Sequence, residues 1–185
     1  AIRMLKRVAA ELGSNVPLPP ALAKTGRKAA IIGAGPCGLT AAYYLALLGH
    51  EATVFEALEQ SGGMLRYGIP QYRLPDEVVD ADIGLIEQSG VNILTGTRVA
   101  SAEALLGQGY DAVFIDSGAW HAASMGIPGE DGPGVLKGIA FLEAVNAGAA
   151  PAIGANVIVV GGGDTAIDAA RVSRRLGAEV VQVYR

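Results

Sequence analysis

The stretch Ala29–Ala57, AAIIGAGPCGLTAAYYLALLGHEATVFEA, decides the fold of this chain. A second stretch, Asn156–Arg185, has the sequence NVIVVGGGDTAIDAARVSRRLGAEVVQVYR and repeats the same pattern 128 residues later. Overlaid without a gap, the two stretches match three glycine pairs: Gly33 with Gly161, Gly35 with Gly163, and Gly49 with Gly177. Each copy has a β-branched apolar run, a glycine turn, a helix-like run and a second apolar run. Alternation of buried strands with helices predicts a parallel sheet in an α/β fold.

The glycines of the first copy have G-x-G-x-x-G spacing, which is typical of a dinucleotide-binding loop of the Rossmann-like kind. Gly33 permits a tight turn, Gly35 lets the backbone approach a pyrophosphate, and Gly38 lets the helix pack closely on the strand. The helix N-terminus offers unpaired N–H groups and partial positive charge to phosphates. Glu56 ends the next strand, where an acid accepts hydrogen bonds from ribose hydroxyls. The first copy therefore predicts a site for a nucleotide with a free ribose, the alternative being a glycine-rich turn without a ligand.

The second copy differs from the first where the ribose is recognised. Its loop is Gly161, Gly162, Gly163, Asp164, Thr165 and Ala166, with alanine in the place of the third glycine. In the overlay Tyr184 replaces Glu56, and Arg185 follows it. A carboxylate would repel a 2′-phosphate, whereas a guanidinium binds one bidentately, so the second copy predicts NADP. The arginines of the intervening helix either add to this site or form a solvated face; they are Arg171, Arg174 and Arg175. Two such sites in series predict a flavoprotein that takes a hydride from a nicotinamide.

The remaining pattern predicts where elements and domains begin and end. We expect helices over residues 1–12, 36–48, 76–89, 101–106 and 138–148, and strands over 29–33, 52–56, 91–94, 97–100 and within 110–120, the last one buried. Residues 57–75 are expected to form a long loop. In the helix over 76–89, one apolar side is predicted from Val78, Val79, Ile83 and Ile86. Three parts follow: an N-terminal helix and linker (1–27), the first part of a FAD-binding domain (28–153), and the truncated start of an NAD(P)-binding domain (154–185).

Composition excludes several other classes of function. The net charge is −4 without a long basic run, which argues against nucleic acid. The 21 uncharged residues from Ala29 to Gly49 could span a bilayer, but their glycines and proline favour a buried strand, turn and helix. The single Cys37 cannot form an internal disulfide or hold an iron–sulfur cluster, and we expect a soluble, cytoplasmic protein. No metal site is predicted, because His50 and His121 lack a second ligand at metal spacing, and turn formation is expected of Glu130 and Asp131.

Several motifs together resemble one family. With GAGPCGL, VFEA, GGMLRYGIPQYRLP, SGAW, GIPGED and GGGDTAIDAAR, the chain resembles the small (β) subunit of NADPH-dependent glutamate synthase. It equally resembles the relatives that reuse this module, such as the flavin part of dihydropyrimidine dehydrogenase and β-chain-like subunits of other redox complexes. The resemblance covers nearly the whole chain, and LRYGIP is its most specific element. In that family an NADPH domain interrupts the FAD domain, which implies that this chain is a fragment. The family's iron–sulfur cysteines would lie upstream or on a partner, because residues 1–27 contain none.

The resemblance also implies roles for individual residues. The FAD pyrophosphate would be lined by Gly33, Ala34, Gly35, Pro36 and Gly38, and the adenosine ribose would be bound by Glu56. The flavin side would be contacted by Gly63, Leu65 and Arg66, with Gly68 and Ile69 close to the ring. The adenine would meet the backbone of Val99, and the cofactor would be covered by Ser117, Gly118 and Ala119. Relatives usually have threonine at Ser117 and alanine at Cys37, so we interpret Cys37 as a small packing residue and do not expect a disulfide reductase.

The implied function is an oxidoreductase module that takes hydride from NADPH onto FAD. Its electrons would pass to iron–sulfur clusters or to a large redox or amidotransferase subunit, as in glutamate synthase. Two alternatives stay open: the same module in a formate, carbon monoxide or aldehyde oxidoreductase, which SGAW mildly favours, and a FAD-binding subunit without turnover. No catalytic residue is expected, because hydride transfer between two bound cofactors requires no protein acid or base.

Overall fold

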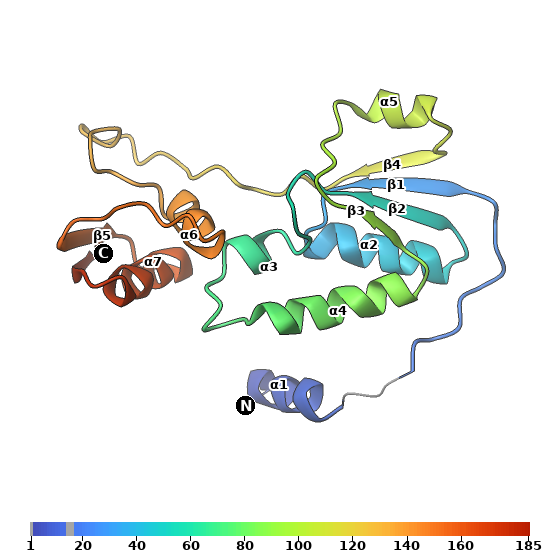
Figure 1. The fold of residues 1–185 in the computed structure, drawn as a ribbon, viewed down its shortest axis with the longest axis horizontal. Helices are drawn as coiled ribbons and strands as arrows, with labels where there is room; N and C mark the ends of the chain where they lie inside the picture. Colours follow the sequence, from blue (N-terminus) through green and yellow to red (C-terminus); the bar gives the residue numbers. More distant parts are fainter. Residues whose placement is uncertain (1, 14–16) are drawn as a thin grey trace.

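The computed structural model describes residues 2–13 and 17–185 (Figure 1). In chain order its elements are α1 (Ile2–Leu12), β1 (Lys28–Ile32), α2 (Pro36–Leu47), β2 (Glu51–Phe55), α3 (Met64–Tyr67), α4 (Asp76–Gln88), β3 (Asn92–Leu94), α5 (Ala102–Gly107), β4 (Ala112–Ile115), α6 (Gly138–Asn146), β5 (Asn156–Val160), α7 (Asp164–Arg175) and β6 (Glu179–Val183). The uncharged stretch after Ala29 forms β1 and α2. Among the described residues, no helix is both long enough and apolar enough to cross a bilayer.

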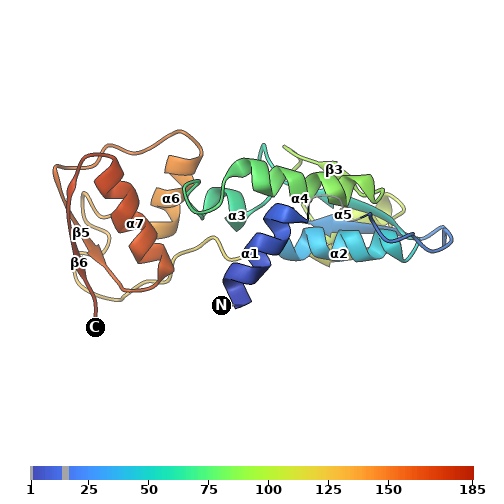
Figure 2. The same ribbon diagram turned by 90° about the horizontal axis from the view of Figure 1, so that it is seen from below.

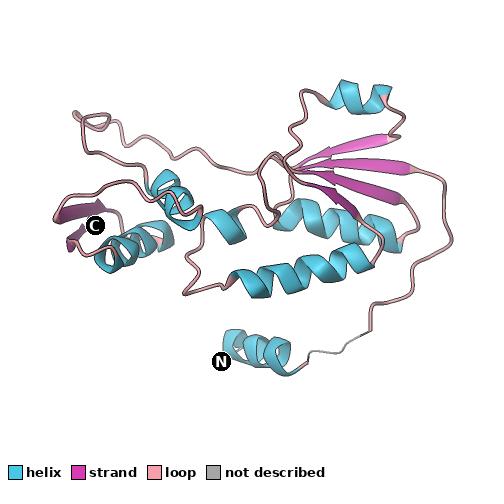
Figure 3. Ribbon diagram, viewed as in Figure 1, coloured by secondary structure: helices cyan, strands magenta, loops and turns pink. Residues whose placement is uncertain are grey.

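The first sheet has four parallel strands in the order β3-β2-β1-β4. Its two faces are covered by different helices, α2 and α4 on one and α5 on the other (Figure 3). Alternate residues of the central strand β1 enter the two cores, Ala29 and Ile31 on the α2 face and Ala30 on the α5 face. This accounts for the continuous apolar run of β1. The predicted α/β fold with a parallel sheet is confirmed.

The second sheet contains β5 and β6, paired in parallel, with α7 connecting them. It lies at the opposite end of the molecule from the four-stranded sheet, with α6 and α7 between (Figures 1 and 2). One side chain row of this sheet is exposed and strongly apolar: Ile158, Val160, Val181 and Val183. The domain boundaries expected after residues 27 and 153 stay predictions.

The two copies have matching backbones. Gly33 and Gly161 have φ of 109° and 130°, and Gly49 and Gly177 have φ of 84° and 96°. The N–H of Gly33 donates to Phe55 O and that of Gly161 to Val183 O, both at 2.8 Å. The gapless overlay therefore corresponds to the same local structure formed twice.

Four expectations about elements are wrong, each for a physical reason. Residues 97–100 form no strand, because the chain turns after β3 and carries Val99 to the opposite face of the sheet. The loop over 57–75 contains the short helix α3. Strand β4 is not buried, because it is the edge strand, and its Phe114 and Ile115 are exposed. Val78 is half exposed, because the inward face of α4 is formed by Val79 and Ile83.

Candidate functional site

The three glycines of the first loop have different surroundings, between β1 and the N-terminus of α2. A Cβ atom at Gly33 would lie 2.0 Å from Asp116 O, and one at Gly38 would lie 2.1 Å from Gly33 O. A Cβ atom at Gly35 would meet only Asp116 Oδ2, at 3.7 Å. Gly33 and Gly38 are therefore required by packing, whereas Gly35 borders open space. Open space at the second glycine is what a bound pyrophosphate needs.

The predicted ribose acid, Glu56, is buried immediately after β2. Its carboxylate accepts hydrogen bonds from Ala34 N at 2.8 Å and from Leu58 N at 2.9 Å. The first of these bonds fixes Glu56 to the glycine loop itself. Each carboxylate oxygen has further acceptor capacity, so the group can still accept from a ribose hydroxyl.

The second loop joins β5 to α7 and has the same form. Gly163 precedes α7 with an extended backbone and no side-chain cap, and a Cβ atom there would meet nothing within 4 Å. The ring of Tyr184 lies over Gly162, where a Cβ atom would be 3.0 Å from it. Arg185 follows Tyr184 and is exposed. The second loop therefore has free backbone N–H groups and an open approach, as the first has.

A pocket of about 240 Å³ lies between two halves of the molecule. The first half contains the four-stranded sheet, and the second half contains α6, β5, α7 and β6. We call this pocket the junction pocket. Gly68 and Ile69, which were expected near the flavin ring, line one side of it. Asp164 and Thr165 of the second loop line the other side. The remaining lining residues are Met64, Arg73, Ile139, Leu142 and Asp168. The structure thus brings together residues that the sequence assigned to two separate dinucleotides.

A family model, pyridine nucleotide-disulphide oxidoreductase, matches residues 27–185. The chain belongs to this oxidoreductase family. The family's name includes a disulphide, which cannot form within these 185 residues because they contain one cysteine. Cys37 is exposed, so its interpretation as a small packing residue is wrong, because α2 turns Gly38, Leu39 and Ala42 inward instead.

Three curated relatives of this oxidoreductase have sequence identities of 44%, 46% and 39% with it. The NADPH-Fe(3+) oxidoreductase subunit beta of Geobacter sulfurreducens is 44% identical over 96% of this chain and 28% of its own length. The NADP(+)-dependent formate dehydrogenase subunit beta of Moorella thermoacetica is 46% identical over 87% of this chain and 24% of its own length. The glutamate synthase [NADPH] small chain of Halomonas elongata is 39% identical over 87% of this chain and 37% of its own length. The resemblance to the glutamate synthase small subunit and its β-chain-like relatives is confirmed, and the chain spans less than half of each relative.

A solved structure supports the fold. FprA of Mycobacterium tuberculosis in complex with NADPH matches with a TM-score of 0.70 and 25% identity, over 80% of this chain and 36% of that one. The predicted Rossmann-like fold, of the kind that binds FAD and NAD(P), is thereby confirmed.

Some of the residues expected around the FAD lie against the first loop. Gly63 is one of them, since a Cβ atom there would be 2.9 Å from Gly35 Cα. Leu65 packs against the main core, and Val99 against the core on the α5 face. The segment Ser117–Ala119 follows β4 next to Gly33, and Trp120 beyond it contacts Tyr67 with ring centroids 6.0 Å apart.

Arg66 has structural partners that the sequence did not indicate. Its side chain is buried, Nε donates to Ser61 O at 2.7 Å, and the guanidinium forms ion pairs with Asp76 and Asp80 at the start of α4. The guanidinium therefore holds α3 against α4. Contact of this residue with a flavin stays a prediction.

Asp116, at the end of β4, was not found by sequence reasoning. Its Oδ2 accepts from Gly38 N at 2.6 Å, which caps α2 from a neighbouring strand because Gly35 has no side chain for this. The sequence did contain a signal for this role of Asp116. The residue is an acid directly before SGAW, at the carboxyl end of a strand that neighbours the glycine loop.

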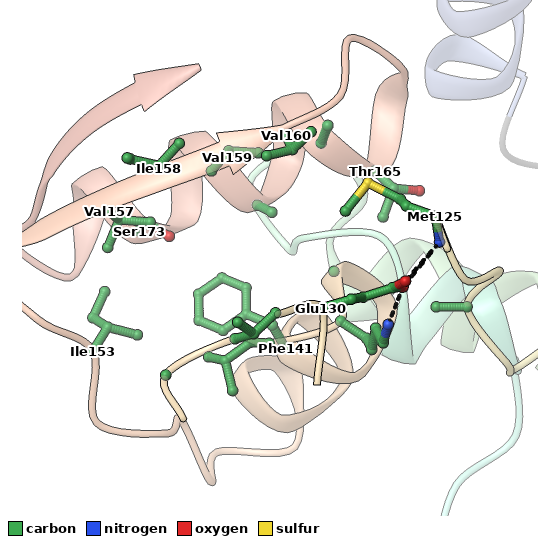
Figure 4. Close-up of a pocket in the computed structure, with 18 of the residues that line it drawn as sticks. Met125, Glu130, Phe141, Ile153, Val157, Ile158, Val159, Val160, Thr165 and Ser173 are labelled. Carbon is green, nitrogen blue, oxygen red and sulfur yellow. Dashed lines mark hydrogen bonds and ion pairs between the residues drawn. The ribbon is translucent and has the colours of Figure 1, made fainter. Parts of the chain in front are cut away.

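A larger pocket of about 630 Å³ lies between the loop over residues 122–137 and the second copy (Figure 4). Phe141 and Val157 are among its mainly apolar lining. Glu130 organises this loop, accepting from Ser124 Oγ at 2.7 Å, from Met125 N at 2.9 Å and from Lys137. The bond from Lys137, then that from Ser124, lowers the pKa of Glu130 to about 2. The expected turn former is thus the centre of a part-buried hydrogen-bond network.

No metal centre is found in the part of the chain that the structure describes, since no three of its His, Cys, Asp and Glu side chains cluster suitably. His50 bonds instead to Thr25 Oγ1 through Nδ1, at 2.7 Å.

Proposed function

We propose that this chain is an oxidoreductase module that takes hydride from NADPH onto FAD and passes the electrons to iron–sulfur clusters or to a partner subunit. One observation carries the proposal: the segment expected beside the flavin ring and the second glycine loop line the same junction pocket. Gly68 and Ile69 reach it from the first half, and Asp164 and Thr165 from the second. A flavin beside Gly68 and Ile69 and a dinucleotide bound at the second loop would therefore have their reactive rings near one place.

The residues of each loop fit the proposed group. For FAD, open space at Gly35 and the buried acid Glu56 match a pyrophosphate and a free ribose. For NADP, open space at Gly163 matches a pyrophosphate, and Arg185 offers a guanidinium where the first copy has no base. The FAD and NADP sites that we propose contain the same residues that were predicted from the sequence.

When both groups are bound, NADPH supplies a hydride that, with one solvent proton, reduces the flavin by two electrons and leaves NADP⁺. The chain's own residues bind and orient the two nucleotides and exclude water from the pocket. Free N–H groups at the starts of α2 and α7 bind phosphate oxygens. Met64, Ile139 and Leu142 give the junction pocket an apolar wall that limits water. No side chain has to move a proton in this step.

The partner belongs to the same proposal. The relatives from Geobacter and Moorella are named as beta subunits, of an NADPH-Fe(3+) oxidoreductase and an NADP(+)-dependent formate dehydrogenase. Their identities of 44% and 46% exceed the 39% of the glutamate synthase small chain from Halomonas. We therefore keep two candidate destinations for the electrons, a glutamate synthase amidotransferase subunit and the large subunit of another redox complex. Clusters on that partner or elsewhere in the protein, and a cytoplasmic location, complete the proposal.

The proposal is tested by mixing the purified protein with NADPH in the absence of oxygen. We expect yellow protein with one FAD per chain, whose flavin absorbance is bleached by NADPH and much more slowly by NADH. Flavin that stays oxidised under NADPH, yet is reduced by dithionite, would support the FAD-binding subunit without turnover. Protein isolated without flavin, and unable to take it up, would contradict both.

A further inference from the structure

The segment Arg66–Arg73, RYGIPQYR, connects the two halves of the molecule, and we call it the clamp segment. It overlaps LRYGIP, the element that the resemblance marked as most specific, and cofactor roles were expected only up to Ile69. Its far end, Tyr72 and Arg73, lies against α7 of the second copy. The segment therefore contacts both halves of the molecule.

The near end of the clamp segment is held by α6. The side-chain amide of Asn146 donates to the backbone oxygens of this segment, at 3.1 Å to Arg66, 3.0 Å to Tyr67 and 3.0 Å to Ile69. Asn146 is about 80 residues away in sequence from these carbonyls. The backbone next to Gly68, which lines the junction pocket, is thus fixed from the second half of the chain.

The far end is held by one charged face of α7. Arg73 Nη1 donates to Asp168 Oδ2 at 2.6 Å, and the side chain of Asp168 is only 5% exposed. Arg171 and Arg175 lie over the ring of Tyr72, with Cζ at 4.8 Å and 4.2 Å from its centroid. Both arginines are exposed, as the solvated-face interpretation expects, and they also stack on the Tyr72 ring. Positions 168, 171 and 175 share one face of a helix, so the contact depends on how α7 is oriented about its axis.

The Tyr72 hydroxyl adds to this contact. Burial, and then the Asp168 carboxylate, raise the pKa of Tyr72, so the hydroxyl keeps its proton and lies 3.5 Å from Asp168 Oδ1. The ring also packs against the apolar cluster formed by Phe141, Leu142 and Val172. Asp168 is therefore buried with a cationic partner and a neutral hydroxyl next to it, as a buried carboxylate requires.

We propose that the clamp segment is a positioning element. In it, Arg73 and Asp168 hold the second half of the molecule, the proposed place of the nicotinamide nucleotide, against the first half, the proposed place of the flavin. The inference rests on the proposed function. Asp168 lies one helical turn after Asp164 and Thr165, so the bond to Arg73 fixes the start of α7 and the second glycine loop with it. The same segment carries Gly68 and Ile69 on the flavin side. Because a misplacement of about 1 Å can cost about 100-fold in rate, such a contact acts on hydride transfer by fixing how the two halves of the molecule lie.

The test compares flavin-loaded variants in stopped-flow reduction by saturating NADPH. We expect Arg73→Gln and Asp168→Asn to keep their FAD and to reduce the rate constant of flavin reduction about 10- to 100-fold. Reduction by dithionite should be unchanged. Arg73→Lys keeps the charge and should retain more of the rate than Arg73→Gln. The double variant should be no slower than either single variant, because both remove one shared contact.

The matched control is Arg27→Gln. Arg27 also pairs with an aspartate, Asp111, at 2.9 Å, but this pair is exposed and lies within the first half. Hydrogen exchange gives a readout besides activity: amides of α7 should exchange faster in Arg73→Gln and at the wild-type rate in Arg27→Gln. If Arg73→Gln yields no folded protein, Tyr72→Leu, which keeps all charges, takes its place with the same expected results.

The outcomes separate the two proposals. Wild-type flavin that NADPH does not reduce contradicts the proposed function. Wild-type flavin that is reduced by NADPH, together with Arg73→Gln reduced equally fast, overturns the clamp alone. An equal loss of rate in Arg73→Gln and Arg27→Gln would also overturn it, since the effect would then be general destabilisation.

Discussion

At the scale of single residues, two glycines of the first loop, Gly35 and Gly38, lie on either side of the start of α2. Substitutions at these two positions test ligand binding and folding separately. Gly35 has φ −77° and ψ 175°, a conformation open to any residue, and its Cβ position is free. We expect Gly35→Val to be colourless, because the side chain occupies the space for the pyrophosphate, and to have the melting temperature of flavin-free wild-type protein.

Gly38→Ala is the matched variant, because its Cβ atom would lie 2.1 Å from Gly33 O, a backbone atom. We expect it to lower the free energy of unfolding by about 1–3 kcal/mol, the usual cost of overpacking. Thermal unfolding and flavin absorbance measure the two effects separately. A Gly35→Val protein with stoichiometric flavin would contradict the assignment of the first loop.

The predicted choice of NADP depends, at the same scale, on Arg185. In the second copy Tyr184 stands where the first copy has its acid, and its ring covers Gly162. A charge-assisted bond from Arg185 to a 2′-phosphate is worth about 1.5–3 kcal/mol, or about tenfold to a hundredfold in preference. Arg185→Ala should therefore raise KM for NADPH and leave KM for NADH nearly unchanged. Steady-state kinetics check this, and similar kcat/KM for both nucleotides in the wild type would refute the NADP assignment.

At the scale of elements, the loop over residues 122–137 depends on one carboxylate. Because the pKa of Glu130 is lowered from 4.5 to about 2, its ionised form stabilises the folded state. This stability is fully present above about pH 4.5 and is lost as the pH falls through about 2. We expect the melting temperature to fall across that window, and Glu130→Gln to have a lower melting temperature at neutral pH with a weaker pH dependence.

Asp131→Asn is the control for this loop, because the Asp131 side chain is 95% exposed and lies 3.9 Å from the same Lys137. Its melting temperature should follow the wild type at every pH. If the melting temperature of Glu130→Gln falls with pH just as that of the wild type does, the pH dependence comes from another group and the prediction is contradicted.

At the scale of the whole molecule, the two sheets differ in how well they are covered. β1 is buried between α2 and α5, whereas β5 and β6 have an exposed apolar row that includes Ile158 and Val181. Hydrogen bonds between strands are protected by the packing over them. In the 185-residue chain, hydrogen exchange should show weak protection from about Asn156 onward and strong protection in β1 and β2. Equal protection in both sheets would contradict the division into two domains.

Local patterns of the sequence determined the two strand–glycine–helix–strand units. The glycines with positive φ, such as Gly33 and Gly161, and the apolar runs beside them specify each unit through contacts between near neighbours. The same locality made the parallel sheet and the family resemblance predictable. It also explains the errors, because whether β4 is an edge strand and whether residues 97–100 find a partner depend on distant parts of the chain.

Only the tertiary structure decided which polar groups meet across the molecule. Asp116 and Gly38 are 78 residues apart, and Arg73 and Asp168 are 95 apart, so no sequence period relates them. Each pair forms where two elements are brought together by apolar packing that is itself non-directional. A charged or capping side chain then acquires its role from its neighbour and not from its own type. For that reason the sequence predicted where dinucleotides would bind, whereas the contact between Arg73 and Asp168 became visible only in the folded chain.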